Sequence, residues 1–204
     1  MKFIEKFSGI FLIAGFLLLI SAVLGLGIAP ATMVDEPYEN QGLPQEVPEL
    51  YKTQYPNPKL YVKALLRGRD LYIREACWHC HSQFVRPTAN ENLRYGPVST
   101  PGEYISPLHL PQLFGTRRVG PDLSREAGRR TNDWHYAHLY KPTNVVPQSV
   151  MPTYPWYFTE INGVPVPNDD GKAIVAYLQW LGTSVMDRKE NIDDFEQETL
   201  PPRE

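Results

Sequence analysis

The sequence is poor in cysteine: among its 204 residues, only Cys77 and Cys80 carry a thiol. A structural zinc site usually takes about four ligands, often from two cysteine pairs, and this chain has a single pair. No disulfide other than one between these two residues can form. Any cysteine chemistry in the chain must therefore come from this pair.

The sequence also lacks a strong excess of charge of either sign, since its formal net charge is −3. That value gives no argument for nucleic-acid binding. There is no internal repeat, and the length suits one compact domain with a tail or two. The 20 prolines favour a loop-rich domain over a helical bundle or a regular sheet.

The cysteine pair belongs to the run Cys77-Trp78-His79-Cys80-His81. Cys-x-x-Cys-His is the signature of covalent c-type haem attachment. Two sulfurs separated by two residues can add to the two vinyl groups of one porphyrin. The following histidine is then held where its imidazole can bind the iron. The run therefore predicts one covalently bound haem c, with Cys77 and Cys80 as thioethers and His81 as an axial ligand.

Two other interpretations of the pair explain less. A thioredoxin-like Cys-x-x-Cys would need a strand and helix unit around it and a reducing compartment. A plain disulfide between Cys77 and Cys80 leaves His81 without a role. Haem attachment also suits an extracytoplasmic compartment, which the N-terminal segment supports.

The N-terminal segment contains an apolar run, residues 8–29, of 22 residues without a charge. About 20 such residues span the hydrocarbon core of a bilayer as a helix. Lysines precede the run and acidic residues follow it, which places the N-terminus in the cytoplasm and the rest of the chain in the periplasm. A cleaved signal peptide is the alternative, but its apolar core is usually shorter, about 7–15 residues. We predict a retained transmembrane anchor over residues 1–29.

The remaining chain divides by composition into three parts. Residues 30–57 contain five prolines among polar and acidic residues, which predicts an extended linker. Residues 58–183 hold the haem motif and form the predicted cytochrome domain. Residues 184–204 are acidic and have few apolar side chains, which predicts a solvated or partner-bound tail.

Two helices are predicted to frame the cytochrome domain. The first begins at Asn57-Pro58, with Asn57 as the N-cap, and runs to the haem motif with Gly68 on its apolar face. The second is capped by Asp169 or Asp170 and ends at Gly182. The apolar positions at helical spacing are Tyr61, Ala64, Leu65, Leu71 and Tyr72 in the first helix, and Ile174, Val175, Tyr177, Leu178 and Leu181 in the second.

These patterns predict a mainly α chain, with one N-terminal transmembrane helix and a loop-rich domain. A helix that leads into Cys-x-x-Cys-His and a helix that closes the domain resemble the class I cytochrome c fold. That fold crosses its first and last helices beside the haem. Gly68, whose side chain is a single hydrogen atom, suits such a close crossing.

The second axial ligand is predicted to be Met151. It follows the haem motif by 70 residues and lies between Pro147 and Pro152, where a stiffened loop can cover the second face of the haem. Of the other methionines, Met33 lies in the linker and Met186 in the tail. The rival candidates are three histidines: His109, His135 and His138.

The sequence Gly120-Pro121-Asp122-Leu123 suggests a partner for His81. An iron-bound imidazole usually donates its second N–H to a carbonyl oxygen, and in cytochromes c a Gly-Pro carbonyl often accepts it. Pro121 is therefore the candidate acceptor, with a plain turn as the alternative. The only basic cluster flanks this turn, and its members could pair with haem propionates or form a solvated face. Its members are Arg117, Arg118, Arg125, Arg129 and Arg130.

Several longer runs of the sequence are more specific than the haem motif alone. They are Cys77-Trp78-His79-Cys80-His81-Ser82-Gln83-Phe84-Val85-Arg86-Pro87, Arg94-Tyr95-Gly96, Gly120-Pro121-Asp122-Leu123, Asp133-Trp134-His135, Ala137-His138-Leu139-Tyr140, Val145-Val146-Pro147 and Met151-Pro152. With these runs, the chain resembles subunit II, the mono-haem cytochrome c subunit, of cbb(3)-type cytochrome c oxidases of the FixO/CcoO family. The resemblance covers the anchor, the linker and the domain to about residue 183.

The resemblance implies a subunit of a haem–copper terminal oxidase in the bacterial inner membrane. Such a subunit takes electrons from a di-haem cytochrome c subunit or a soluble cytochrome and passes them to haem b of the catalytic subunit. Cys77, Cys80, His81 and Met151 match the haem-binding positions of the family. The family also has a calcium site at the interface with the catalytic subunit, to which Ser99 is a candidate contributor. No catalytic residue is expected in this chain, since oxygen reduction takes place in its partner.

Three other functions stay open at this point. The chain could be the small cytochrome c subunit of a nitric oxide reductase, which also has one anchor and one haem c. It could be a free membrane-anchored electron shuttle, for which the Pro-rich linker is suited. It could also be an assembly or anchoring protein in which Cys-x-x-Cys-His is incidental, and then it would carry no covalent haem.

Overall fold

A computed structural model describes residues 2–29, 42–104, 106–115 and 117–183 of the chain. These residues fall into two compact units, Met1–Gln41 and Gly42–Glu204. The linker methionine Met33 and the tail methionine Met186 lie outside the described residues.

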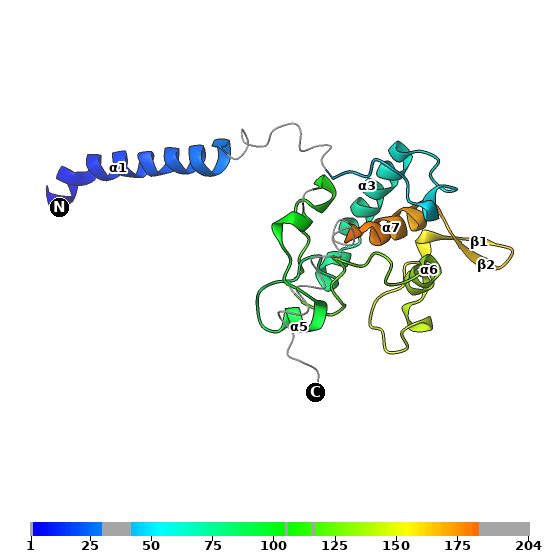
Figure 1. Ribbon diagram of the computed structural model, residues 1–204. Helices are drawn as coiled ribbons and strands as arrows, with labels where there is room; N and C mark the ends of the chain where they lie inside the picture. The colour runs from blue at the N-terminus through cyan, green and yellow to red at the C-terminus, as the bar shows by residue number, and fades with distance from the viewer. Residues whose placement is uncertain (1, 30–41, 105, 116, 184–204) are drawn as a thin grey trace, which may run out of the picture. The chain divides into compact units, whose positions relative to one another are not determined.

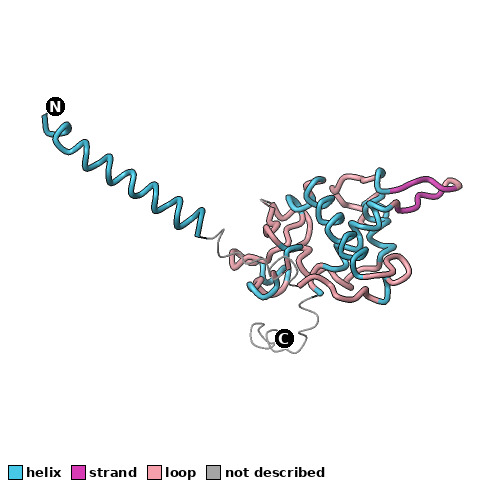
Figure 2. The backbone as a smooth tube through the Cα atoms, turned by 90° about the horizontal axis from the view of Figure 1, so that it is seen from above, coloured by secondary structure: helices cyan, strands magenta, loops and turns pink. Residues whose placement is uncertain are grey.

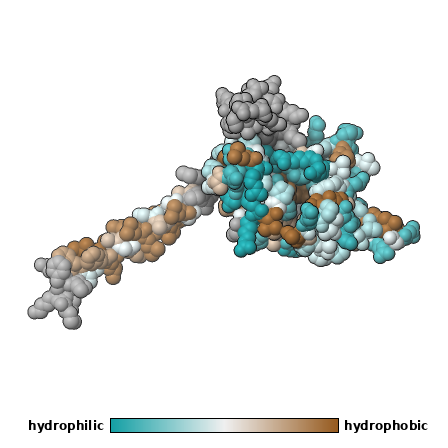
Figure 3. Space-filling view, turned by 90° about the horizontal axis from the view of Figure 1, so that it is seen from below, coloured by the Kyte–Doolittle hydropathy of each residue, from teal (hydrophilic) through white to brown (hydrophobic). Residues whose placement is uncertain are grey.

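The first unit is an apolar helix made of α1 (Lys2–Ala22) and a π-helical continuation, η1 (Val23–Ile28). The 22 residues Phe7–Ile28 are long and apolar enough to cross a membrane, and none of them is buried. Apolar side chains follow one another along this helix in Figure 3. The N-terminal apolar helix predicted from the sequence is thus confirmed, and lipid is the environment that suits a helix with such a surface.

The second unit is built from short helices and long connections, with a single two-stranded sheet among its described residues (Figures 1 and 2). The predicted mainly α fold is confirmed. Its α-helices are α3 (Pro58–Arg74), α4 (Cys77–Cys80), α5 (Glu91–Tyr95), α6 (Asn132–Tyr140) and α7 (Asp169–Trp180). Its 3₁₀ turns are η3 (Glu49–Tyr51), η4 (Pro101–Glu103), η5 (Pro107–His109), η6 (Pro142–Asn144) and η7 (Pro155–Tyr157).

Helix α3 begins where the sequence predicts. Asn57 is extended, and its side chain accepts a hydrogen bond of 3.0 Å from the backbone N–H of Leu60. Pro58 occupies the first helical position, where its missing N–H costs nothing. The six residues on the predicted face are all buried: Tyr61, Ala64, Leu65, Gly68, Leu71 and Tyr72.

Helix α7 begins with a different cap from the one predicted. Asn168 is the N-cap, and its side chain accepts a hydrogen bond of 3.0 Å from the N–H of Gly171. Asp169 and Asp170 therefore lie in the first turn, where their charge suits the helix dipole. The prediction of an aspartate cap is wrong because Asn168 takes the extended conformation that a cap requires. Helix α7 ends as the sequence predicts, since Gly182 follows it with a φ of 88°.

Helices α3 and α7 pack directly against each other (Figure 1), as the prediction of a closing helix requires. A Cβ atom on Gly68 would lie 2.2 Å from the carbonyl oxygen of Ala173 and 2.6 Å from Cβ of Tyr177. Only glycine allows this approach. At the edge of the contact, Arg67 donates two hydrogen bonds of 2.8 Å to the carboxylate of Asp170.

Replacing Gly68 by alanine should destabilise this unit by about 3 kcal/mol, at the upper end of the usual cost of overpacking. The added methyl group meets backbone atoms of α7 that cannot rotate away. Denaturant unfolding measures the change in the free energy of unfolding. Lys63→Ala on the exposed side of the same helix is the control, with an expected change near zero. Equal stability of the Gly68→Ala and Lys63→Ala variants would show that the crossing is not this tight.

The segment before α3 also contributes to the core. Val47 and Tyr51 are 8% and 2% exposed, and the ring of Tyr51 stacks on that of Tyr61 with centroids 5.6 Å apart. The hydroxyl of Tyr51 donates to the side-chain oxygen of Asn132 at the start of α6. Residues 42–57, although rich in proline, thus pack with the second unit, because their spaced aromatic and aliphatic side chains find partners on α3.

The sheet is a hairpin of β1 (Phe158–Ile161) and β2 (Val164–Pro167), paired antiparallel with Ile161 opposite Val164. Asn162 and Gly163 both have positive φ, 53° and 77°, as the tight turn requires. Asn-Gly between two short β-type runs is a strong sequence signal for such a hairpin. The hairpin leads into α7 and thereby fixes where that helix begins.

Candidate haem site

The haem motif forms a short turn of helix, α4, directly after α3. Ala76 between the two helices is left-handed, with φ of 56°, which changes the direction of the chain. Both cysteines are free thiols; Cys77 is half-buried against the core and Cys80 is exposed. Burial raises the pKa of the Cys77 thiol to about 12. The motif therefore presents one sulfur at the protein surface and one at the edge of the core.

His81 is held both at its imidazole ring and at its backbone. Its Nδ1 lies 3.0 Å from the carbonyl oxygen of Pro121, which can only accept a hydrogen bond. Nδ1 then carries the proton, and Nε2 keeps the lone pair that a metal needs. The hydroxyl of Tyr72 on α3 donates to the carbonyl oxygen of His81. Burial lowers the pKa of His81, which favours the neutral, metal-binding form.

Two glycines let neighbouring loops approach the motif closely. A Cβ atom on Gly120 would lie 2.2 Å from Cε1 of His81, and one on Gly115 would lie 2.2 Å from the carbonyl oxygen of His79. The N–H of Gly120 also donates a 3.0 Å hydrogen bond to the carbonyl oxygen of Cys80. The loop that carries Gly120 and Pro121 therefore packs directly against the imidazole of His81.

The chain after His81 runs beside the chain after Pro121. Leu123 N–H donates to the carbonyl oxygen of Ser82 at 2.9 Å, and Phe84 N–H donates to the carboxylate of Asp122 at 3.1 Å. Together with the bond from Gly120 to Cys80, these contacts hold the Pro121 carbonyl in register with the His81 ring.

A buried group of charged side chains supports this pair of segments. Arg118 lies at its centre, with 8% of its side chain exposed; its Nη1 lies 2.5 Å from an Asp122 oxygen, and its other nitrogens donate to Glu91 and to the Phe84 carbonyl. Arg86 also binds Glu91. Burial alone would raise the pKa of Glu91, but hydrogen bonds from Arg118 and Arg86 lower it to about 2. No local sequence pattern indicates this group, because Glu91 and Arg118 lie 27 residues apart.

The arginines of the basic cluster thus have different roles in the structure. Arg118 belongs to the buried group, and Arg125 donates hydrogen bonds of 2.8 and 2.9 Å to the carboxylate of Glu103. Arg130 lies over the ring of Trp134, 5.1 Å from its centroid. Arg118 and Arg125 already have protein carboxylates as partners, which leaves Arg117 and Arg129 as the more available partners for an added anion.

Met151 lies in the connection between η6 and η7. It is half-buried and packs against the core cluster that includes Tyr154 and Tyr157. Its N–H donates to the hydroxyl of Ser149, whereas its neighbours Val150 and Pro152 are exposed. The residue is therefore anchored through its backbone at the surface of the domain.

Two of the three rival histidines are enclosed by aromatic or acidic neighbours. His109 is 7% exposed and stacks on Trp180 with centroids 4.6 Å apart. His135 is 4% exposed, and its Nε2 lies 3.7 Å from Glu126. Burial lowers the pKa of both to about 4. Both side chains are thus packed inside the domain.

His138 lies on helix α6, one turn after His135. It stacks on Trp134 with ring centroids 4.7 Å apart, and its Nδ1 is buried without a hydrogen-bond partner among the described residues. Burial lowers its pKa. The side chain of His138 is half-buried, whereas those of His109 and His135 are buried.

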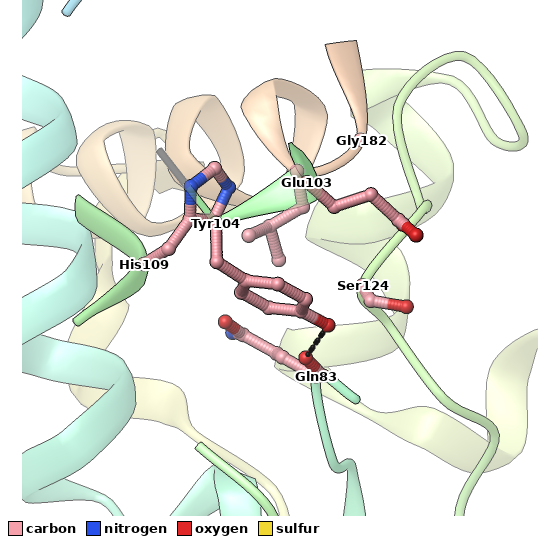
Figure 4. Close-up of a pocket in the computed structure, with 7 residues that line it drawn as sticks. Gln83, Glu103, Tyr104, His109, Ser124 and Gly182 are labelled. Carbon is pink, nitrogen blue, oxygen red and sulfur yellow. Dashed lines mark hydrogen bonds between the residues drawn. The ribbon is translucent and has the colours of Figure 1, made fainter. Parts of the chain in front are cut away.

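A separate small cavity lies beside α7 and has a volume of about 10 Å³, about one water molecule. Figure 4 shows Gln83, Tyr104 and His109 around it, with the Tyr104 hydroxyl donating to the backbone oxygen of Gln83 at 2.8 Å. The cavity is far too small for a haem. It is therefore not the cofactor site.

Ser99, the candidate calcium contributor, is buried and already bonded. Its hydroxyl accepts from Val85 N–H at 2.9 Å and lies 3.0 Å from the Tyr104 hydroxyl. Within the described ranges there is no group of three or more His, Cys, Asp or Glu side chains that could hold a metal ion. The calcium site stays a prediction that concerns an interface with another chain.

The residues around the motif fit a haem c. The His81 ring has its Nδ1 bonded to the Pro121 carbonyl, which leaves Nε2 as the nitrogen for a metal. Gly120 packs against the ring where a Cβ atom would clash, and the two free thiols are separated by two residues, as the motif requires. Residues 2–165 match the family model described as cytochrome c oxidase, mono-heme subunit/FixO. A search of curated proteins gave no match. The match supports the resemblance to subunit II of cbb(3)-type oxidases, and since it spans more than half of the sequence, the chain belongs to the FixO family of mono-haem cytochrome c oxidase subunits.

Proposed function

We propose that this chain carries one haem c, bound through Cys77 and Cys80 with His81 and Met151 as axial ligands, and relays electrons within a cbb(3)-type oxidase. The observation that carries the proposal is the contact of His81 Nδ1 with the Pro121 carbonyl inside a Cys-x-x-Cys-His turn. A plain disulfide would not need that orientation, and a zinc site, which would use it too, lacks its further ligands among the described residues. Haem c, when bound, supplies an iron that changes between two oxidation states.

The protein residues have three tasks in this proposal. Cys77 and Cys80 fix the cofactor covalently at the edge of the core. Pro121 and Gly120 hold the His81 ring at one orientation, and Met151, between Pro147 and Pro152, would supply the second ligand. A methionine opposite histidine raises the reduction potential and leaves no open position for oxygen. The chain then transfers electrons without any oxygen chemistry of its own.

The location and partners follow from the family and the anchor. The apolar helix Phe7–Ile28 would hold the chain in the bacterial inner membrane, with its N-terminus in the cytoplasm and the haem domain in the periplasm. Electrons would arrive from a di-haem cytochrome c subunit or a soluble cytochrome and leave to haem b of the catalytic subunit. The proposal includes a calcium ion at that subunit interface.

The test is a mild-detergent pull-down of the tagged full-length chain from its native membrane, with a reduced-minus-oxidised spectrum and a metal count. Haem b and copper should accompany haem c at a fixed ratio. Recovery of haem c alone would contradict a stable oxidase complex and favour a free shuttle. Haem b with non-haem iron and no copper would assign the chain to a nitric oxide reductase, and absence of covalent haem would refute any electron-transfer role.

A further inference from the structure

The buried group centred on Arg118 has a direct connection to the proximal side of the site. Asp122 follows Pro121 in sequence, and its side chain is 3% exposed. Four donors hold its carboxylate: Phe84 N–H at 3.1 Å, Ser124 N–H at 2.8 Å, the Ser124 hydroxyl at 2.5 Å and Arg118 Nη1 at 2.5 Å.

This carboxylate connects the two segments that determine the His81 orientation. Through Phe84 it binds the chain that leaves the haem motif, and through its own backbone it fixes the peptide that ends in the Pro121 carbonyl. Rotation of that carbonyl would require breaking contacts of a buried carboxylate, which is costly because its charge would lose buried partners. The contacts of Asp122 therefore determine the direction of the hydrogen bond between His81 Nδ1–H and the Pro121 carbonyl.

The charge of Asp122 also acts on the ring. Its carboxylate belongs to the residue that directly follows Pro121, whose carbonyl oxygen lies 3.0 Å from His81 Nδ1. A negative charge near the imidazole stabilises a positive metal bound to it, more so in the more highly charged oxidation state. Arg118 and, through it, Glu91 set how much of that charge is neutralised.

We propose that Asp122, held by Arg118 and Ser124, is a positioning residue for the proximal ligand His81 and a determinant of the haem reduction potential. The inference rests on the proposed haem attachment at Cys77, Cys80 and His81. Its readout is a midpoint potential, which a purely structural carboxylate elsewhere in the domain would not change.

The experiment compares the full-length chain with Asp122→Asn and Glu103→Gln, each purified with its haem and titrated against a redox buffer. Glu103 is the matched control, because it is also a buried carboxylate paired with an arginine, Arg125. In Asp122→Asn the potential should rise enough to change the reduced-to-oxidised ratio at least threefold at the wild-type midpoint, about 28 mV since tenfold is 59 mV. Glu103→Gln should keep the wild-type potential.

The possible results separate this inference from the proposed function. A wild-type chain without covalent haem on a denaturing gel refutes the proposed function itself. A haem-loaded Asp122→Asn variant with the wild-type potential, or an equal shift in Glu103→Gln, overturns the role of Asp122. If Asp122→Asn yields no haem-loaded protein, Ser124→Ala decides. This variant keeps the carboxylate but removes one donor, so its potential should fall, and an unchanged potential overturns the inference.

Discussion

The double variant Cys77→Ala, Cys80→Ala is expected to abolish covalent haem in this chain. Each thiol is free, and no third cysteine exists that could replace either of them. A haem held only through its axial ligands dissociates when the protein is denatured. Peroxidase staining after denaturing electrophoresis should therefore show a band at the wild-type position and none for the variant, at equal protein load.

The control for this experiment is His79→Ala. His79 lies between the two cysteines, is exposed and stacks on Trp78 at 3.8 Å. As a spacer it should be replaceable, so its variant should keep the stained band. Staining that survives the double cysteine substitution would refute the thioether assignment. Loss of staining in His79→Ala would show that the turn itself, and not its sulfurs, limits attachment.

Replacing Met151 by leucine is expected to lower the reduction potential by an amount on the order of 0.1 V, within the range of about 0.8 V that axial ligands cover. The thioether favours the reduced iron, and leucine has a similar volume but no ligand atom. The open position should also bind carbon monoxide. A redox titration and a carbon monoxide difference spectrum measure the two effects on the same sample.

Met186→Leu is the matched control, since it makes the same substitution in the C-terminal tail. It should leave both the potential and the carbon monoxide spectrum unchanged. If Met151→Leu behaves like this control, Met151 is not the ligand. His138 then becomes the first alternative, because its side chain is half-buried, whereas His109 and His135 are buried inside the domain.

Two helices of the domain, α3 and α7, could be predicted from local chemistry. Asn57-Pro58 marks the start of α3 by capping and by the fixed φ of proline, and its apolar spacing gives the buried face residue by residue. The same reasoning found the face of α7. This reasoning did not identify the N-cap of α7, because three consecutive residues have side chains suited to capping: Asn168, Asp169 and Asp170.

The candidate site was only partly readable from the sequence. Cys-x-x-Cys-His and Gly-Pro are short motifs that can be recognised in the sequence. The contact between Pro121 and His81 could therefore be predicted from them. The buried charges could not, because Glu91 begins α5 whereas Arg118 and Asp122 lie in a loop 27 residues or more later in the chain. Nothing local indicates which arginine pairs with which carboxylate. The packing of Tyr51 against Tyr61 was hidden for a similar reason, since proline around Tyr51 indicates an extended chain but not what it lies against.

The crossing of α3 and α7 has a consequence for the order in which the protein folds. Arg67 and Asp170, which meet at the edge of this contact, are 103 residues apart in the chain. Helices form in about a microsecond, but contacts between distant parts of a chain must first overcome the entropy of closing the loop between them. During synthesis, the cysteines at 77 and 80 emerge long before α7. The thiols are thus accessible to an attachment enzyme on a nascent chain whose core has not yet closed over Cys77.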